Sequence, residues 1–567
     1  MASLIEDTAF RYAVKNAFLH NGTADLGAVI GKVAALHKEI VLVKEIPKIK
    51  AIVEQVNAMP FEELEKNYKR LEDSYELKAR PQREGLPELE WAEAGEPVIV
   101  RFAPNPSGSM HLGHARAALL NDAYAKKYSG KLFLRLDDTD PKIKKPVENS
   151  KEIFERDLKW LGVHNDGTSF ASDKLDNYYT YIRKLLVMGK AYVCSCKSET
   201  WREYTKAKKP CPHRELGVDQ QLQAFSDMLS HKLKEGQAVV RLKTDLEHKD
   251  PSIRDWWVAK IVDVVDHPNP KAKDKHVWPS YNLASAIDDH EMGITLIIRG
   301  QEHAQNATKQ KYLYEYLGWE YPHAIHVGRI KLEGATLSKS KIKQAVEEGE
   351  FSGFDDPRIG SIENLRRRGI SPEAIRESIL ALGINPNDAT LSVEALYTAN
   401  RRVIDLKSPR LTFIEKPVKL DVQFGQKFTA KFPWHEEVPQ MGEKTYELKE
   451  GQQRLLVPEA GLQKVKKGEV FRLKHAWNVK KGEQEKGFTL AQYVGVGKIN
   501  KEIVPWLLEN EFLDAEIAMP DGSKKSGIVE KAVQQLKEGD TVLLEHFGYC
   551  RIDKLGDKTV QFWYAHA

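Results

Sequence analysis

The sequence predicts a multidomain protein that combines an α/β core with an all-β region and begins with helices. The chain has 567 residues, of which 41% are hydrophobic and 30% charged, a composition typical of several soluble globular domains. Apolar strands and amphipathic helices alternate between residues 98 and 162. Beyond residue 405, apolar and polar residues alternate with a period of two between Gly-rich turns. These patterns indicate a parallel sheet followed by β-barrel material.

The first region, residues 1–95, is predicted to be helical because residues 5–17 and 60–72 are amphipathic. A polar stretch from Pro81 to Glu96 ends it. No apolar run in the chain approaches the roughly 20 residues that span a bilayer, and the N-terminus lacks the apolar core of a signal peptide. We therefore expect a cytoplasmic protein that does not contact a membrane.

Residues 96–190 are predicted to form the first half of the core. A strand at 98–102 leads through a Pro/Ser/Gly turn into a helix-forming stretch at 115–121, which places His111 and His114 at a helix N-terminus. Free N–H groups and the positive end of the helix dipole favour phosphate there. Gly113 leaves room for a flat group such as an adenine ring.

Two further elements support a parallel sheet. Residues 131–138 read as a strand that ends in acids, and residues 150–162 as a helix that stops at a glycine. In such sheets, ligands lie beyond the carboxyl ends of the strands.

Residues 276–345 are predicted to complete the core. An apolar run at 325–330 precedes a polar loop that contains Ser338, Lys339 and Ser340. A lysine there could reach leaving phosphate oxygens, and together with the two histidines it would clamp a nucleoside triphosphate. Such chemistry is mostly positioning and charge neutralisation. The alternative is a capped helix and a solvated basic loop.

An insertion at 191–275 contains three of the four cysteines, so no disulfide framework is expected. Cys194 and Cys196, then Cys211 and His213, form two chelating pairs that suit a tetrahedral structural Zn2+. The alternative is free thiols at a chance spacing. Cys550 is expected to be simply buried.

A helical connector at 346–404 and a β-barrel region at 405–567 are predicted to follow. A net charge of +4 is small for a nucleic-acid binder, so any RNA contact must come from local basic patches. The candidates for RNA contact are Arg366, Arg367, Arg368, Lys474 and Trp477. A solvated face for the basic side chains, and a core position for the aromatic one, is the open alternative.

Together these segments resemble class I aminoacyl-tRNA synthetases, with residues 111–114 as the HIGH motif and 337–340 as the KMSKS loop. Within that class, residues 101–106, 136–141 and 281–303 resemble glutamyl-tRNA synthetase. Residues 351–360 and 365–370 are similar to its archaeal and eukaryotic branch. Thr336 replaces the first lysine of the KMSKS pattern, but Lys339 is present, so we expect activity to survive.

The resemblance implies a Rossmann-like core that uses ATP and Mg2+, and a reaction in two steps. Glutamate would first form glutamyl-adenylate, and the acyl group would then pass to the terminal adenosine of tRNA. By resemblance, His111, His114 and Lys339 stabilise the triphosphate. The residues implied in ATP binding are Gly113, Glu302, Arg329, Ile330, Ser338 and Ser340, with Arg329 and Ile330 at the adenine and Glu302 near the ribose.

The resemblance also assigns a glutamate pocket. Arg101 and Tyr281 would hold the side-chain carboxylate, Arg299 the α-carboxylate and Asp137 the ammonium, because arginine suits a carboxylate well. Ala103, Asn105 and Ser285 complete the implied pocket. Arg299 favours glutamate over glutamine, because a buried arginine without its carboxylate is costly. The alternative for such arginines is a salt-bridged strand end.

The implied partners are L-glutamate and tRNA-Glu, and charging of tRNA-Gln stays open. Residues 1–95 could dock a tRNA-dependent amidotransferase or another synthetase. Two rival functions are a glutaminyl-tRNA synthetase and a catalytically silent RNA-binding paralogue. The first is disfavoured by Arg299, and the second by the presence of His111, His114 and Lys339.

Overall fold

The computed structural model describes residues 2–19, 22–36, 45–71, 86–333, 345, 348–351 and 356–567. The chain divides into two compact units, Met1–Glu84 and Gly85–Ala567.

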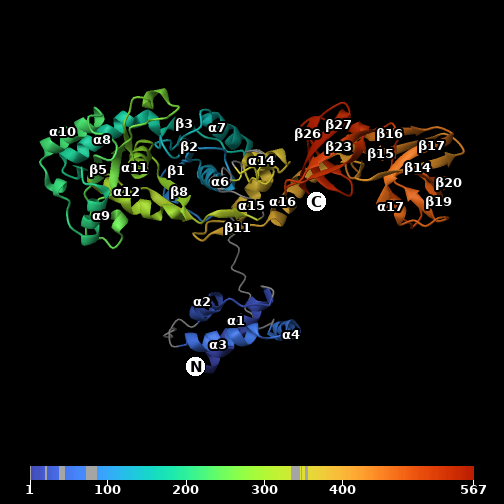
Figure 1. Ribbon diagram of the computed structural model, residues 1–567, viewed down its shortest axis with the longest axis horizontal. Helices are drawn as coiled ribbons and strands as arrows, with labels where there is room; N and C mark the ends of the chain where they lie inside the picture. The colour runs from blue at the N-terminus through green and yellow to red at the C-terminus, as the bar shows by residue number, and fades with distance from the viewer. Residues whose placement is uncertain are drawn as a thin grey trace. The chain divides into compact units, whose positions relative to one another are not determined.

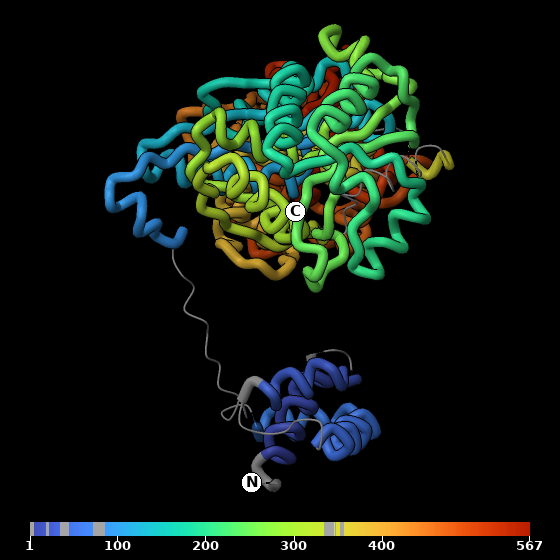
Figure 2. Tube along the Cα trace, turned by 90° about the vertical axis from the view of Figure 1, so that its left-hand side faces the viewer, coloured from blue at the N-terminus to red at the C-terminus, as the bar shows by residue number. Residues whose placement is uncertain are grey.

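The first unit is helical, as the sequence predicts (Figure 2). Its helices are α1 (Ala2–Leu19), α2 (Leu26–Leu36), α3 (Ile46–Asn57) and α4 (Phe61–Leu71). Small residues of α1, among them Ala9 and Ala13, are fully buried and pack against Val33, Ile49 and Val53 of the next helices. Because alanine has almost no side chain, the helices can approach closely and share one core.

A five-stranded parallel sheet forms the centre of the second unit, in the order β3-β2-β1-β8-β9 (Figure 1). Its strands are β1 (Ile99–Phe102), β2 (Lys131–Leu136), β3 (Gly167–Phe170), β8 (Leu296–Gly300) and β9 (His323–Val327). The middle strand, β1, aligns Val100 with Leu132 on one side and Leu296 on the other. The predicted parallel α/β core is confirmed.

Helices α6 (Leu112–Lys127) and α7 (Ser150–Trp160) connect the first strands and bury apolar residues against the sheet, and α5 (Glu90–Glu93) precedes β1. Helices α8 (Leu175–Val187), α11 (Tyr281–Glu291) and α12 (Ala304–Leu317) bury their apolar residues in a second cluster. Helix α7 ends as expected, with Gly162 just beyond it at φ 70°, a conformation that glycine adopts without strain.

A four-stranded antiparallel sheet, in the order β4-β5-β6-β7, interrupts the core between β3 and β8. The elements of this insertion are β4 (Ala191–Cys194), α9 (Ser198–Ala207), α10 (Val218–Leu229), β5 (Val239–Leu242), β6 (Trp257–Ile261) and β7 (Val277–Pro279). Its own buried residues, such as Phe225 and Trp278, join those of α8 and α11 in one cluster, so the insertion packs firmly on the core.

The connector contains α14 (Ile362–Arg367), α15 (Pro372–Ala381) and α16 (Val393–Ile404). It differs from the helical prediction at one point, because β11 (Ala389–Leu391) pairs in parallel with β10 (Ile330–Leu332). This pairing joins the connector directly to the second half of the core.

The C-terminal region is all-β, as predicted, and contains two seven-stranded sheets. One sheet comprises β12 (Arg410–Leu411), β25 (Thr541–Leu544), β26 (Gly548–Leu555), β27 (Thr559–His566), β23 (Phe512–Ala518), β24 (Lys524–Glu530) and β13 (Phe413–Ile414). The other comprises β21 (Ile503–Val504), β18 (Val470–Leu473), β19 (Asn478–Glu485), β20 (Phe488–Gly495), β14 (Pro417–Phe424), β17 (Gly451–Pro458) and β22 (Leu507–Leu508). A smaller pair is β15 (Phe428–Pro433) with β16 (Glu443–Leu448), and α17 (Glu459–Gln463) follows β17. Cys550 is fully buried in this region, as expected.

Candidate active site

A cavity of about 1030 Å³ lies at the carboxyl ends of the core strands, between the sheet and the insertion. Arg101 and Arg299 are the next-to-last residues of β1 and β8, Asp137 and Arg329 lie just beyond β2 and β9, and all four line the cavity. Because parallel strands bring their carboxyl ends to one edge, residues far apart in sequence meet there. The other predicted site residues that line it are Ala103, Asn105, His111, Gly113, His114, Tyr281, Glu302 and Ile330.

The two histidines lie at the start of α6, as the sequence predicts. His111 is the N-cap residue, with extended backbone, and its Nδ1 accepts a hydrogen bond of 3.1 Å from the Gly113 N–H. The rings of His111 and His114 stack with their centroids 3.9 Å apart. A Cβ atom at Gly113 would lie 2.9 Å from His111 Cε1, so only glycine fits without displacing the ring.

The start of α6 is also held by the connector. His111 and Ser361 form an isolated antiparallel bridge, and the Ile362 N–H donates to the Met110 carbonyl over 2.9 Å. Lys339, Ser338 and Ser340 lie outside the described residues, so their predicted roles remain predictions from the sequence.

A buried charge network holds two residues of the predicted glutamate pocket. Arg101 donates to both carboxylate oxygens of Asp289, over 2.9 and 3.3 Å. Arg135, which is fully buried, donates to Asp137 over 2.7 Å and to Asp289 over 2.6 Å. It also contacts Ser285 over 3.1 Å, which places Ser285 beneath the cavity rather than in its lining.

Burial and the two arginines act in opposite directions on these acids. Burial raises the pKa of Asp289, but Arg101 and Arg135 more than offset this, so its pKa is lowered overall. Burial outweighs the effect of Arg135 at Asp137 and leaves that pKa raised. Asp289 therefore stays ionised and fixes Arg101 at the edge of the cavity.

Arg299 has a different environment, because its contacts are all with uncharged side chains. It is 5% exposed, and its guanidinium donates to Gln310 over 2.9 Å, to the Tyr321 hydroxyl over 3.0 Å and to His326 over 3.4 Å. Burial lowers the pKa of His326 and Arg299 lowers it further, so this histidine is neutral. Among the described residues, no carboxylate lies within 4.0 Å of Arg299.

The remaining predicted contacts surround the same space. The Asn105 amide donates to the Asp137 carbonyl over 3.1 Å, and the ring of Tyr281 lies 5.3 Å from that of His303. Arg329 and Glu302 form an ion pair of 3.8 Å, although both are well exposed. The polar groups that the resemblance assigns to adenine and ribose therefore lie on one side of the cavity.

The insertion lines the opposite side of the cavity with basic and aromatic groups. The Arg241 guanidinium stacks on Trp201 at 3.5 Å, and the Lys260 ammonium lies 5.3 Å from the ring of Trp257. Trp257 is 38% exposed. Flat aromatic and arginine surfaces next to positive charge are suited to stacking on unpaired nucleotides.

The four predicted metal ligands meet after β4. Cys194 Sγ and Cys196 Sγ lie 3.5 and 3.3 Å from Cys211 Sγ, and His213 Nδ1 lies 3.4 and 3.2 Å from the thiols of Cys196 and Cys211. All four ligand atoms are within 4.8 Å of one another. Ligands about 2.3 Å (sulfur) and 2.0 Å (nitrogen) from a tetrahedral Zn2+ would have similar separations. Ser195 Oγ, 2.7 Å from His213 Nε2, orients the ring so that Nδ1 faces the thiols.

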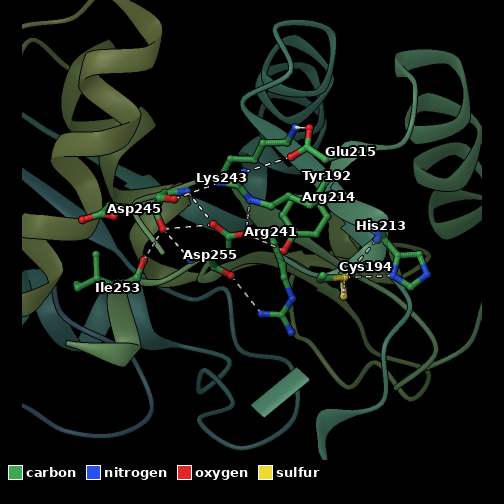
Figure 3. Close-up of polar contacts among 12 residues, drawn as sticks. Tyr192, Cys194, His213, Arg214, Glu215, Arg241, Lys243, Asp245, Ile253 and Asp255 are labelled. Atoms are coloured by element: carbon green, nitrogen blue, oxygen red, sulfur yellow. Dashed lines mark hydrogen bonds and ion pairs between the residues drawn. The ribbon is translucent and has the colours of Figure 1, made fainter. Parts of the chain in front are cut away.

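A buried aspartate joins this cluster to the strands that line the cavity (Figure 3). The Asp255 carboxylate accepts from the Tyr192 hydroxyl and from Arg214 Nε, each over 2.9 Å, and from the Thr244 N–H over 2.8 Å. Tyr192 lies two residues before Cys194, and Arg214 follows His213. The position of the cluster is therefore coupled to the end of β5.

The predicted RNA contacts in the connector and barrel region need correction where the side chains are already engaged. Trp477 is 4% exposed and packs against Phe424 and Phe428, so it belongs to the barrel core and cannot stack on a base. Lys474 pairs with Glu545 of the other sheet.

Two of the three consecutive arginines hold the connector to the barrel region. Arg367 donates twice to Asp553, over 2.8 Å each, and Arg368 is buried and donates to the carbonyls of Tyr564 and Ala565. Arg366, partly exposed near Trp160, is the member of the run that keeps a surface available for phosphate.

Two family descriptions match the chain. Residues 97–406 match the catalytic domain of "tRNA synthetases class I (E and Q)", and residues 408–491 match the anti-codon binding domain of the same group. The chain belongs to the class I glutamyl- and glutaminyl-tRNA synthetase family.

Relatives of this synthetase cover its whole length. A glutamate–tRNA ligase from Pyrococcus abyssi is 44% identical over 574 residues, covering 99% of this chain and 100% of the relative. One from Methanothermobacter thermautotrophicus is 39% identical, covering 99% of each. A crystal structure of a glutamate tRNA ligase from Elizabethkingia meningosepticum is 22% identical, with a TM-score of 0.40, covering 55% of this chain and 70% of that one. The resemblance predicted from the motifs is confirmed.

The synthetase uses buried residues that motif reasoning missed. Arg135 and Asp289 hold the pocket from beneath, and Arg116 lines the cavity from α6. A charged residue inside an apolar strand or an alanine-rich helix is the signal that marks such positions.

Among the helices described here, none has the length and apolar character needed to cross a membrane.

Proposed function

We propose that the protein ligates L-glutamate to tRNA-Glu with ATP, through glutamyl-adenylate, and releases AMP and diphosphate. The observation that carries this proposal is Arg299, a buried cation surrounded by neutral side chains at the carboxyl end of a core strand. Burying an arginine without a counter-charge costs free energy unless a ligand supplies the missing anion. The α-carboxylate of glutamate supplies it.

The charges in the pocket match glutamate. Three cations, Arg101, Arg135 and Lys174, are balanced by three acids, Asp137, Asp288 and Asp289, which leaves Arg299 as the uncompensated charge beside them. Glutamate carries two carboxylates and one ammonium, so its net charge of −1 complements that excess. Glutamine is neutral overall and leaves the charge of the pocket uncompensated.

In the activation step, Arg299 and Asp137 orient the amino acid while an oxygen of its α-carboxylate attacks the α-phosphorus of ATP. His111 and His114 face the phosphates from the start of α6, where the helix dipole and free N–H groups favour negative charge. Mg2+ that accompanies ATP supplies further charge neutralisation. Arg329 and Ile330 lie against the adenine, and Glu302 lies near the ribose.

In the transfer step, a hydroxyl of the tRNA's terminal ribose attacks the carbonyl carbon of the adenylate, and AMP leaves. The Trp201, Arg241, Trp257 and Lys260 side of the cavity provides stacking surfaces and positive charge for the unpaired end of the tRNA. The residues at the carboxyl ends of the core strands then hold the adenylate, and the insertion holds the end of the tRNA next to it.

The two alternative functions, a glutaminyl-tRNA synthetase and a catalytically silent paralogue, make different demands on these residues. A glutaminyl enzyme binds a neutral amino acid, which would leave the excess positive charge of this pocket uncompensated. A silent paralogue has no use for His111 and His114 in a cavity large enough for ATP and an amino acid. Charging of tRNA-Gln, docking by the N-terminal unit and a cytoplasmic location remain predictions.

We also propose that Cys194, Cys196, Cys211 and His213 hold a structural Zn2+. The purified protein is expected to contain one zinc per chain, because thiolate and imidazole ligands at this spacing bind it tightly. Cys211→Ser should lower the zinc content and expose residues 191–275 to proteolysis, whereas Cys550→Ser, at the buried cysteine outside the cluster, should retain the metal. Zinc content is measured by elemental analysis, and wild-type protein without stoichiometric zinc would refute this site.

Glutamate-dependent exchange of labelled diphosphate into ATP tests the activation step. Wild-type protein with tRNA-Glu and Mg2+ is expected to catalyse exchange with glutamate, at a kcat/KM at least about 10³ above that with glutamine. Reactions without tRNA show whether activation depends on bound tRNA. Faster exchange with glutamine would favour the glutaminyl rival, and no exchange with either amino acid would favour the silent paralogue.

A further inference from the structure

Arg116 joins three parts of the core that are far apart in sequence. It lies in α6, five residues after His111, and is 2% exposed. Its guanidinium donates to the Gly328 carbonyl over 2.7 Å and to the Gly383 carbonyl over 3.2 Å. Arg116 therefore connects the helix of the two histidines to the segment that follows β9 and to the end of α15.

The segment after β9, to which Arg116 donates, has few backbone pairings of its own. Strand β10 is three residues long and, among the residues that the structure describes, pairs only with β11. The backbone before it is confined between Arg116 and the turn at 385–388, because the Gly328 N–H donates to the Asn385 carbonyl over 2.8 Å. A Cβ atom at Gly328 would lie 1.9 Å from the Asn387 carbonyl oxygen. The Gly328 peptide is thus fixed on both sides.

This segment carries the residues assigned to the adenine. Arg329 and Ile330 follow Gly328 directly and line the cavity, as does Arg116 itself. The Arg329 N–H donates to Asp388 over 2.9 Å, which continues the attachment to the 385–388 turn. The histidines assigned to the triphosphate lie on the same helix as Arg116.

We infer that Arg116 is a positioning residue for ATP: it sets the spacing between the element that holds the triphosphate and the element that holds the adenine. The inference rests on the proposed function, which places ATP across these two elements. Two carbonyl acceptors and an exposure of only 2% fix the guanidinium. The guanidinium has several donors in one plane, so it can reach both carbonyls at once. A shift of the adenine segment relative to α6 would weaken contacts at both ends of one ligand.

The test compares Arg116→Met and Arg116→Lys with Arg376→Met. Arg376 is the control, because it also joins the connector to the core, by donating to the carbonyls of Leu161 and Gly162 and by pairing with Asp122 of α6 over 2.8 Å, and it lies outside the cavity lining. Steady-state exchange gives KM for ATP and for glutamate, calorimetry gives the affinity for AMP, and thermal unfolding gives Tm. AMP reports on the adenine end without requiring catalysis.

Arg116→Met should raise KM for ATP and weaken AMP binding at least about tenfold, while KM for glutamate changes less than about threefold. Arg116→Lys, which retains a donor for one carbonyl, should recover part of the loss. Arg376→Met should lower Tm and leave both KM values near wild type.

Wild-type KM for ATP in Arg116→Met, or equal increases in KM for ATP and glutamate, would overturn the inference. If Arg116→Met does not fold, Arg116→Lys decides, since unchanged AMP affinity in a folded Lys variant also overturns it. A wild-type protein that binds AMP but fails to activate glutamate would instead refute the proposed function.

Discussion

Arg299→Met is expected to reduce kcat/KM for glutamate by about 10²- to 10³-fold, equivalent to about 3–4 kcal/mol. The variant removes the cation that the α-carboxylate of the substrate neutralises. KM for ATP should change little, because Arg299 contacts Gln310, Tyr321 and His326 rather than the assigned nucleotide residues. Arg299→Lys should recover little activity, because an ammonium cannot reproduce the fork of the guanidinium.

The stability of this variant separates a substrate-binding role from a structural one. Without substrate, Arg299 is a buried charge with no acid within 4.0 Å among the described residues, so its removal should leave Tm unchanged or higher. Arg368→Met is the control, because Arg368 is also buried but attaches the connector to the barrel region by donating to the carbonyls of Tyr564 and Ala565, and the substitution breaks that attachment. It should lower Tm and retain the wild-type KM for glutamate. An Arg299→Met enzyme that is destabilised yet saturates normally with glutamate would contradict the assignment.

Lys339→Ala is expected to slow adenylate formation by about 10²- to 10³-fold, or about 3–4 kcal/mol, with little change in glutamate affinity. The lysine is assigned from the sequence as the group that neutralises charge on the departing diphosphate, a charge that develops mainly in the transition state. Single-turnover formation of glutamyl-adenylate measures this step directly. Lys341→Ala, in the same polar loop, is the control and should retain most of the rate. A near-wild-type rate for Lys339→Ala would remove this lysine from the mechanism.

The hydrophobic pattern of the sequence predicted those site residues that lie at the carboxyl ends of strands. Because the apolar runs at 98–102 and 295–300 form adjacent parallel strands, Arg101 and Arg299 meet at one edge. The start of α6 was equally predictable, because a Pro/Ser/Gly turn before a helix-forming stretch fixes where the helix begins.

The buried charge network beneath the pocket could not be predicted in this way. The pairing of Arg135 with Asp289, 154 residues away, depends on how β2 and α11 pack, and no spacing rule in the sequence encodes it. The same holds for Arg116, whose acceptors are backbone carbonyls and leave no trace in side-chain patterns.

Several of the basic and aromatic candidates are engaged in other contacts for a related reason. The position of Trp477 within a basic run does not say whether its ring belongs to the core or to a ligand surface, and here it belongs to the core. Likewise, Arg367 and Lys474 find their acids at Asp553 and Glu545, in strands much later in the chain. A cluster of positive charge in sequence is therefore weak evidence for phosphate binding until its partners are known.

The most direct test of the central claim is aminoacylation of separate tRNA-Glu and tRNA-Gln transcripts with labelled glutamate or labelled glutamine, in the presence of ATP and Mg2+. The excess positive charge of the pocket predicts that glutamate, with a net charge of −1, and not the neutral glutamine, is attached to tRNA-Glu. Glutamate on tRNA-Gln as well would define the tRNA range without altering the chemistry. Attachment of glutamine, or of neither amino acid, would contradict the proposed function.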